Sequence, residues 1–103
     1  MHVISRSPFN EAMFKFPDSA TALADLLKVL EKGEFPHPES LKKRIQTLDN
    51  FKYRNKWWVM DVSGNKIRVI AYIDFRLQKA FIKHIGTHDE YDRLTKHYRE
   101  HKE

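Results

Sequence analysis

The sequence predicts an α+β fold, in which an antiparallel β-sheet has two N-terminal helices packed on one face and is followed by a C-terminal helix. Three patterns support this prediction. Apolar residues recur at helical spacing in the first third of the chain, two strand–turn–strand patterns begin at residue 57, and a helix start signal follows the last strand. A chain of 103 residues suits one compact unit, so we expect a single domain spanning residues 1–103.

The first half of the chain is predicted to be mainly helical. Residues 2–4 form a short edge strand, and a first helix begins near Pro8 and stops at Pro17. A second helix ends at Gly33 and carries one apolar stripe, which consists of Leu23, Leu26, Leu27 and Leu30. Residues 38–44 read as a short helix or turn that ends in three basic residues.

The sheet begins with a hairpin. Residues 63–66, Ser-Gly-Asn-Lys, separate two apolar runs, and Gly-Asn at the centre suits a two-residue turn. This turn places Asp61 opposite Arg68, and the pairs Val59–Ile70 and Trp57–Tyr72 follow from it.

A second turn at residues 76–79, Arg-Leu-Gln-Lys, is predicted to add a third strand. Its register pairs Tyr72 with Lys83, Ile70 with Ile85 and Arg68 with Thr87. Because successive residues alternate between faces, the two faces differ. The nearly apolar face, which should take the helices, has Trp58, Met60, Val62, Ile67, Val69, Ala71, Ile73, Ala80, Ile82 and His84. The mixed face, which should meet water or a ligand, has Trp57, Val59, Asp61, Arg68, Ile70, Tyr72, Phe81, Lys83, Ile85 and Thr87.

A capping box follows the last strand, with Thr87 at the N-cap and Glu90 three residues later. His88 is then the first helical residue, and Tyr91 lies three positions on, near it on one helix face. A helix N-terminus also offers free N–H groups and the positive end of a dipole, which favour an anion such as phosphate. We therefore expect His88 and Tyr91 to lie beside the basic residues of the mixed face.

The positive charge of the chain is concentrated in the predicted sheet. The whole chain has a net charge of +5, whereas residues 52–83 alone hold eight basic and two acidic side chains, a net charge of +6. A basic sheet indicates a polyanionic partner, with nucleic acid first, although a basic solvated surface has the same composition.

Composition excludes several classes of protein. There is no Cys, so disulfides and thiolate metal sites are excluded. No segment is long and apolar enough to span a membrane, and the first ten residues lack the apolar core of a signal peptide, so we expect a cytoplasmic protein with no membrane partner. His97 and His101 have the helical spacing of metal ligands, but they lack a third ligand, so no metal and no cofactor are expected.

Three segments carry a family resemblance: LDNFKY at residues 48–53, GNKIRV at residues 64–69 and THDEYD at residues 87–92. With them the chain resembles the HigB toxins of type II toxin–antitoxin systems, which belong to the RelE/ParE-like superfamily of small bacterial toxins. The resemblance covers essentially the whole chain in length and element order. It implies a RelE-like compact domain.

The resemblance also implies an activity and partners. It implies a ribosome-dependent endoribonuclease, an mRNA interferase, that cuts mRNA in the A site of the 70S ribosome and inhibits translation. It implies a cognate HigA-type antitoxin with a helix-turn-helix domain, and contact with operator DNA only through that antitoxin. By position, Arg68 matches the strand arginine of RelE-like nucleases, His88 lies where relatives place a basic or His residue, and Tyr91 lies near a C-terminal Tyr of some members. The chain departs from RelE at Trp58 and Met60, where RelE has lysines.

RNA can be cut without a metal by its own 2′-OH. The enzyme must help to remove the hydroxyl proton, stabilise the added negative charge on phosphate, and protonate the leaving 5′-oxygen. We assign Arg68 and Lys83 as phosphate clamps and His88 as general acid or base, while Tyr91 orients the 2′-OH or stacks on a base. The residues predicted to bind RNA are Lys52, Tyr53, Arg54 and Lys56.

These assignments have structural and functional alternatives. Arg68 can simply pair with Asp61 across the hairpin, Tyr91 can simply pack, and Lys83 can be an exposed strand lysine. Two other functions stay open: a ParE-like toxin that inhibits DNA gyrase, and a non-catalytic RNA- or ribosome-binding module. The first should tolerate loss of His88, whereas the second should need the phosphate clamps but not the proton-transfer groups.

Overall fold

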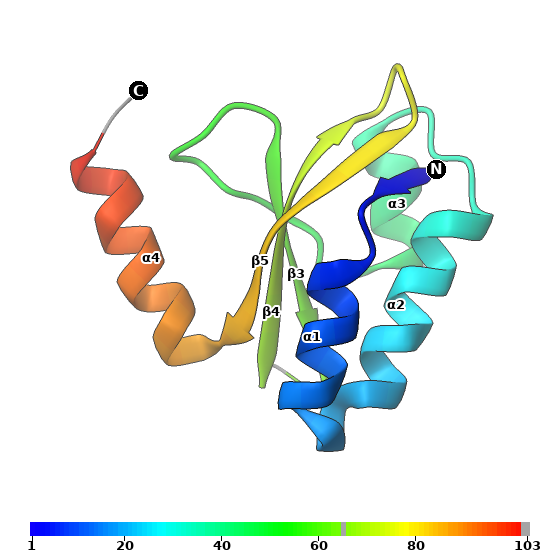
Figure 1. Cartoon of the computed structure of the whole chain (residues 1–103). Coiled ribbons are helices and arrows are strands. Elements are labelled where there is room, and N and C mark those ends of the chain that lie inside the picture. The colour runs from blue at the N-terminus through cyan, green and yellow to red at the C-terminus, as the bar shows by residue number, and fades with distance from the viewer. Residues whose placement is uncertain (65, 102–103) are drawn as a thin grey trace.

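The computed structural model describes residues 1–64 and 66–101 and has the predicted α+β fold (Figure 1). In chain order the elements are β1 (His2–Ile4), α1 (Ser7–Lys15), the 3-10 helix η1 (Pro17–Ser19), α2 (Ala20–Lys32), α3 (Pro38–Arg44), β2 (Asp49–Asn50), β3 (Trp57–Val62), β4 (Ile67–Asp74), β5 (Lys79–Thr87) and α4 (His88–Glu100). The predicted helices and the three predicted strands are therefore confirmed in type and place.

The five strands form one sheet in the order β1-β5-β4-β3-β2. β1 pairs in parallel with β5, and the other neighbours pair antiparallel, so the sheet is mixed rather than antiparallel throughout. A strand of three residues such as β1 carries no signal in its own sequence for its partner, because pairing depends on the distant strand that offers a matching edge and face.

The first hairpin has the predicted register. Asp61 pairs with Arg68, as predicted, and the pairs Val59–Ile70 and Trp57–Tyr72 follow. Gly64 has a φ of 59°, in the left-handed region that glycine adopts at little cost. The other central residue of the predicted turn, Asn65, lies outside the described residues.

The second hairpin differs from the prediction. The last pair before the turn is Asp74–Lys79, so the loop has four residues rather than two. Gln78 holds this loop, because its side-chain amide donates to the carbonyls of Phe35 (2.6 Å) and Phe75 (2.7 Å) and accepts from the N–H of Phe35 (3.0 Å). Phe35 is 43 residues away in the chain, so the local turn pattern contained no signal for this contact.

A β-bulge in β5 changes the register again. The partner is His84 at Ile70 but Ile82 at Ala71, which leaves Lys83 as the extra residue on β5. An inserted residue of this kind shifts the alternation of the strand that contains it.

The bulge moves several side chains away from their predicted faces. Gly86, not Thr87, lies opposite Arg68, and Ile85 packs against the core under the helices. The prediction that put His84 on the helical face and Ile85 and Thr87 on the mixed face was therefore wrong. The only signal of the extra residue in the sequence is the spacing of Ile82 and Ile85, which are three residues apart and both pack against the core.

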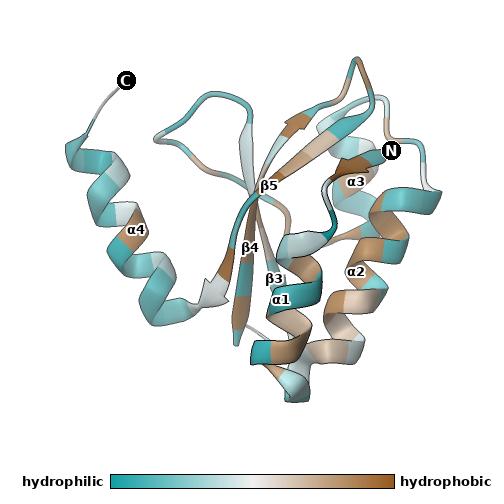
Figure 2. Cartoon of the chain, viewed as in Figure 1, coloured by the Kyte–Doolittle hydropathy of each residue, from teal (hydrophilic) through white to brown (hydrophobic). Residues whose placement is uncertain are grey.

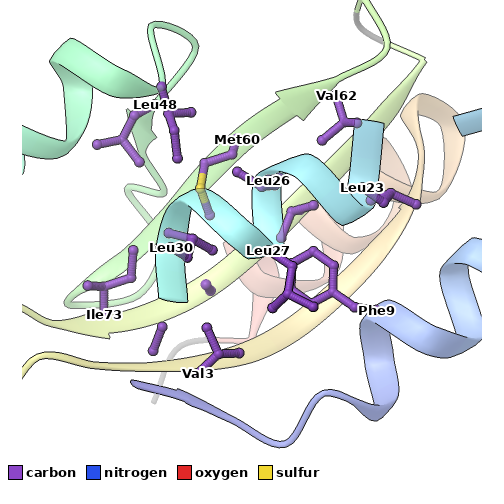
Figure 3. Close-up of a cluster of buried hydrophobic side chains, with 14 of the residues drawn as sticks. Val3, Phe9, Leu23, Leu26, Leu27, Leu30, Leu48, Met60, Val62 and Ile73 are labelled. Carbon is purple, nitrogen blue, oxygen red and sulfur yellow. The ribbon is translucent and has the colours of Figure 1, made fainter. Parts of the chain in front are cut away.

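The core lies between the apolar face of the sheet and helices α1 and α2, which run side by side against it (Figure 1). The predicted leucine stripe of α2 is buried there, near Phe9 of α1 and Met60 of β3 (Figure 3). Burial of such side chains contributes about 1.5–3 kcal/mol each before entropic costs. In the part of the chain that the structure describes, no helix has the length and apolar character needed to cross a membrane.

Helix α4 lies on the other side of the sheet from α1 and α2, so the helices do not all share the apolar face (Figure 1). No residue of α4 is buried, and most of its surface is hydrophilic (Figure 2). Its predicted capping box is confirmed: Oγ1 of Thr87 accepts from the N–H of Glu90 (3.3 Å), and Oε1 of Glu90 accepts from the N–H of Thr87 (3.2 Å). The helix reaches the sheet through Tyr91 and Tyr98, which pack on the mixed face.

Candidate functional site

Arg68 is at the centre of the candidate site. It extends from β4, and its Nε lies 2.9 Å from Oδ1 of Asp61 on β3. The two side chains are 20% and 21% exposed. The Nε atom is buried and makes no hydrogen bond to a described residue. The contact is therefore an ion pair in which the Nε–H of Arg68 does not point at the Asp61 carboxylate. The predicted pairing of Arg68 with Asp61 is thus confirmed.

Two residues from the first turn of α4 form a row with Arg68. The guanidinium carbon lies 4.6 Å from the centroid of the Tyr91 ring, and the ring of His88 is 6.3 Å from that of Tyr91. Nδ1 of His88 is 3.8 Å from Oδ2 of Asp92, and 45% of the His88 side chain is exposed. The structure therefore brings Arg68, Tyr91 and His88 together, with the imidazole at the exposed end of the row.

Lys83 lies on the same face but against another ring. Its Nζ is 5.6 Å from the centroid of Trp57, whereas Arg68 packs on Tyr91. The two predicted phosphate clamps are therefore held by different aromatic side chains. A cation–π contact at an exposed site contributes only about 0.5–1 kcal/mol, so an anion can draw the Lys83 ammonium away from the ring.

An aromatic cluster connects the strands with α4. It consists of Phe51, Tyr53, Trp57, Tyr91 and Tyr98. Phe51 is its centre: it is 2% exposed, and its ring centroid is 5.7 to 6.2 Å from those of the other four. Its pairs with the three tyrosines are edge to face, and such pairs contribute about 0.5–1.5 kcal/mol beyond the burial of their surface. The cluster covers part of the mixed face and fixes the position of α4.

Two of the predicted RNA-binding residues are exposed. Lys52 and Lys56 both face solvent, and Nζ of Lys52 lies 5.3 Å from the centroid of the Tyr53 ring. Lys56 has a φ of 63°, and its carbonyl accepts from the N–H of Ile73 (3.0 Å) at the end of β4. The backbone of Lys56 is therefore fixed while its ammonium stays accessible.

Arg54, also predicted to bind RNA, is turned toward α4. Its guanidinium donates to the carbonyls of Tyr98 (3.3 Å) and His101 (2.6 Å), and it stacks on the Tyr98 ring at 4.6 Å. It also donates to the carbonyl of Tyr53 (2.7 Å). A cation at the C-terminal end of a helix satisfies its last carbonyls and meets the negative end of its dipole. Arg54 thus holds α4 in place, a role that the sequence did not predict.

A surface hollow of about 680 Å³ opens at the end of the sheet where β3 begins and β4 ends. All four predicted RNA-binding residues line it, so the structure brings them together. Arg76, from the loop between β4 and β5, adds a cation that the sequence analysis did not assign. Among the described residues that line the hollow, the only acid is Asp74.

His84 is a partly buried histidine that the sequence analysis placed on the wrong face. Its Nε2 is buried and has no hydrogen-bond partner among the described residues. Burial lowers the pKa of His84, against the opposing effect of the Glu90 carboxylate. The pKa of Glu90 is lowered too, because the N–H of Thr87 and the ammonium of Lys15 outweigh its own burial. A neutral imidazole therefore lies beside the start of α4.

The chemistry available at the mixed face is that of cations, an imidazole and a phenol. Within residues 1–64 and 66–101, no group of three or more His, Cys, Asp or Glu side chains is placed to hold a metal ion. His97 and His101 stack on each other, with ring centroids 4.3 Å apart. The row of Arg68, Tyr91 and His88 contains a guanidinium, a group able to bind phosphate, and an imidazole, a group able to transfer protons.

Comparison with known proteins gives one consistent family. Residues 19–94 match the family model HigB_toxin, described as the RelE-like toxic component of a toxin–antitoxin system. The chain is 52% identical over 103 residues, 100% of both chains, to the mRNA interferase HigB of Escherichia coli O6:H1 (strain CFT073). It is 43% identical over 95 residues to the mRNA interferase toxin HigB of Escherichia coli K12 and to the mRNA interferase HigB of Shigella flexneri, covering 92% of this chain and 91% of each relative.

Proposed function

Because this chain belongs to the HigB toxin family, the RelE-like toxic components of toxin–antitoxin systems, we propose that it is an mRNA interferase that cuts translated mRNA on the ribosome and so inhibits translation. The relatives named mRNA interferase support the activity. The single observation that carries the proposal is the row of Arg68, Tyr91 and His88 on the mixed face. This row combines the Arg68 cation of the basic sheet with the His88 imidazole at the start of α4.

The proposed reaction uses the RNA's own 2′-OH. The 2′-oxygen forms a bond to the adjacent phosphorus, and the bond from phosphorus to the 5′-oxygen of the next nucleotide breaks. The 2′-OH proton passes to a base, and the leaving 5′-oxygen takes a proton from an acid, so the products end in a 2′,3′-cyclic phosphate and a 5′-hydroxyl. An imidazole exchanges protons near neutral pH, and His88 is exposed enough to meet a substrate. We assign His88 to one of the two proton transfers.

Arg68 is the proposed main phosphate clamp. Asp61 holds its guanidinium on one side and the Tyr91 ring holds it on the other, so its position is set before the substrate arrives. A donor fixed in this way stabilises developing charge at no further cost in reorganisation, and its loss lowers the rate by roughly 10²–10³-fold. Lys83 supplies a second cation, and Tyr91 orients the 2′-OH or stacks on a base.

The segment 52–56 is the proposed path of the RNA away from the cut. Lys52 and Lys56 are exposed and suit contacts with phosphates, and Tyr53 offers a ring beside them. Arg54 acts on RNA mainly through the position of α4, since its guanidinium is engaged with carbonyls of that helix.

The family places the chain in a toxin–antitoxin system, which includes an antitoxin. We further propose that this antitoxin is of the HigA type, with a helix-turn-helix domain, and that operator DNA is bound only through it. The proposed place of action is the A site of the 70S ribosome in the cytoplasm.

The test is mRNA cleavage on translating ribosomes, with cut positions mapped by primer extension. The wild-type chain should cut within codons, and Arg68→Ala and His88→Ala should each cut at least about a hundredfold more slowly. Arg93→Ala and His97→Ala are matched controls, because both residues lie on exposed positions of α4 outside the row. Both should cut at the wild-type rate.

Two outcomes would contradict the proposal. If Arg68→Ala and His88→Ala stay folded and cut normally, the row is not the active site. If the wild-type chain is toxic in cells but cuts no mRNA, the proposed nuclease activity is wrong. In that case gyrase inhibition, read out as DNA damage, or ribosome binding becomes the question.

A further inference from the structure

The hollow at the end of β3 and β4 has the size and lining of a small-ligand site. Its volume of about 680 Å³ lies within the usual range for sites that take a small molecule or one nucleotide. It combines cations with aromatic rings, which are the two kinds of group that bind single-stranded RNA. The predicted RNA-binding residues line one side of it, but neither the candidate catalytic row nor the family match assigns a role to Trp58, Phe75 and Arg76 on its other side.

We propose that this hollow binds one unpaired RNA nucleotide, with its phosphate held by Lys56 and Arg76 and its base placed against Trp58 and Phe75. The inference rests on the proposed function in taking RNA as the ligand, and it adds a site to the mixed-face row. The nucleotide comes from the mRNA or from ribosomal RNA, since both present the same phosphate and base.

The cations of the hollow are available to an anion. Lys56 and Arg76 are exposed, and their side chains form no ion pair or hydrogen bond with another described residue. Lys52 adds a third exposed ammonium. The one lining acid, Asp74, is engaged by the N–H of Leu77, which donates to its Oδ1 (3.0 Å). The balance of charge in the hollow therefore favours phosphate.

The aromatic wall suits a base. The rings of Trp58 and Phe75 meet edge to face, with centroids 5.9 Å apart, and both side chains are only half-buried. Such a pair leaves ring surface on which a base can stack whatever its identity. Asn55 lies on the same lining, and its amide can hydrogen-bond to a base edge.

A neighbouring hollow limits the site to one nucleotide. It has a volume of about 380 Å³ and adjoins the first at Trp58. Its lining has two acids, Glu39 and Asp49, and one cation, Lys42, whose ammonium donates to the carbonyl of Leu48 (2.9 Å), so its charge disfavours a second phosphate. The RNA strand should therefore leave the first hollow on the side away from Glu39 and Asp49, over the segment 52–56.

The site is separate from the row on the mixed face. Trp57 and Trp58 are consecutive in β3, so their side chains point to opposite faces of the sheet. Trp57 belongs to the aromatic cluster and lies against Lys83, whereas Trp58 lines the hollow. The two indoles thus report on the two surfaces independently.

The test is a titration with uridine 5′-monophosphate, followed by the indole N–H signals of the two tryptophans in NMR spectra. Trp57→Phe and Trp58→Phe assign the two signals. The Trp58 signal should shift with saturation while the Trp57 signal stays in place, and Arg76→Ala should weaken binding about tenfold. Arg99→Ala is the matched control, because it removes an exposed arginine outside the hollow and should leave the affinity unchanged.

Two results would overturn the site: a Trp58 signal that does not move, or equal weakening by Arg76→Ala and Arg99→Ala. Failure of the nucleotide site can be distinguished from failure of the proposed nuclease activity. If the monophosphate binds but the wild-type chain does not cut mRNA, the hollow stands and the proposed function falls. If mRNA is cut but no monophosphate binds, the proposed function stands and the nucleotide site falls.

Cross-linking on the ribosome identifies the source of the nucleotide. mRNA or ribosomal RNA that contains 4-thiouridine is irradiated with the bound protein, and the peptide that contains Trp58 is isolated. Fragmentation of the peptide must locate the cross-link at Trp58 rather than at Trp57; such a cross-link from labelled mRNA assigns the nucleotide to the message, and one from labelled ribosomal RNA assigns it to the ribosome. Either result supports the site, whereas a peptide cross-linked to neither RNA counts against it.

Discussion

Replacing Arg54 by alanine should loosen α4 while leaving the sheet folded. No residue of α4 is buried, so the helix depends on a few contacts at its edges. At the C-terminal end Tyr98 packs on Phe51 and Trp57. Arg54 adds hydrogen bonds to the carbonyls of Tyr98 and His101 and a stack on the Tyr98 ring. At the other end Tyr91 and the capping box remain in Arg54→Ala.

The size of the effect follows from the contacts that are lost. Each hydrogen bond to a carbonyl of the last turn contributes about 0.5–1.5 kcal/mol, and the values at this part-exposed position lie near the lower limit. The cation–π contact with Tyr98 adds about 0.5–1 kcal/mol. Arg54→Ala should therefore weaken the docking of α4 by about 2 kcal/mol, which raises the population of the undocked helix roughly 30-fold.

Hydrogen–deuterium exchange measured by mass spectrometry reads this population directly. Peptides from α4 should exchange faster in Arg54→Ala, while peptides from β4 exchange at the wild-type rate. Arg93→Ala is the matched control, since it removes an exposed arginine from the same helix. If α4 exchanges at the wild-type rate in Arg54→Ala, Arg54 does not hold this helix against the sheet. If RNA affinity then fell as well, Arg54 would be a direct RNA ligand.

Three further changes test the packing around the site. Burial lowers the folded-state pKa of His84 below its ordinary value of 6.5, so the contribution of His84 to stability should be fully present above pH 6.5 and be lost as the pH falls below it; urea midpoints on both sides of pH 6.5 should show a smaller fall in His84→Gln than in the wild type. Phe51→Ala should lower the free energy of unfolding by about 3–5 kcal/mol in urea titrations, because Phe51 is the buried centre of the aromatic cluster, and a loss below about 1 kcal/mol would contradict that role. Gly86→Ala should destabilise the chain by about 1–3 kcal/mol, because the new methyl would lie 2.6 Å from Nε2 of His84, and the loss should be smaller in a His84→Ala background, where only the contacts with Glu90 at 3.1 Å remain.

The predictable parts of the fold are those that the local sequence specifies. The turn predicted at residues 63–66 gave the observed register of β3 and β4, because a two-residue turn leaves one way to pair its flanking strands. The capping box located the start of α4 to the residue, since both of its hydrogen bonds are made between Thr87 and Glu90. Arg68 could therefore be placed beside Asp61 and near Tyr91 from sequence alone.

The unpredicted parts depend on contacts between distant residues. The loop between β4 and β5 has four residues because Gln78 is tied to Phe35, far away in the chain. The bulge at Lys83 then put His84, rather than Ile85, on the Arg68 side of the sheet. The contact between Gln78 and Phe35 has no signal in the local sequence, whereas the bulge has a weak one, because Ile82 and Ile85 are three residues apart and strict alternation put His84 on the apolar face.

In the candidate site, too, the features set by local sequence were predicted and those set by distant contacts were not. The set of Arg68, His88 and Tyr91 depended on one hairpin register and one helix start, and the structure brings these three together. For Arg54 the sequence indicated only a cation in a basic segment, whereas its partners are carbonyls 44 and 47 residues away. The hollow also needed tertiary structure, because it is formed where the segment 52–56 meets the end of β4.

The claim that this chain cuts mRNA by attack of the 2′-OH can be tested with one substrate. An mRNA carrying a single 2′-deoxynucleotide at a mapped cut position is translated with the wild-type chain, and cuts are read by primer extension. Cleavage should disappear at the deoxy position and continue at the unmodified sites of the same message. Cleavage at the deoxy position at the unmodified rate would contradict the mechanism, because the attacking oxygen is absent there.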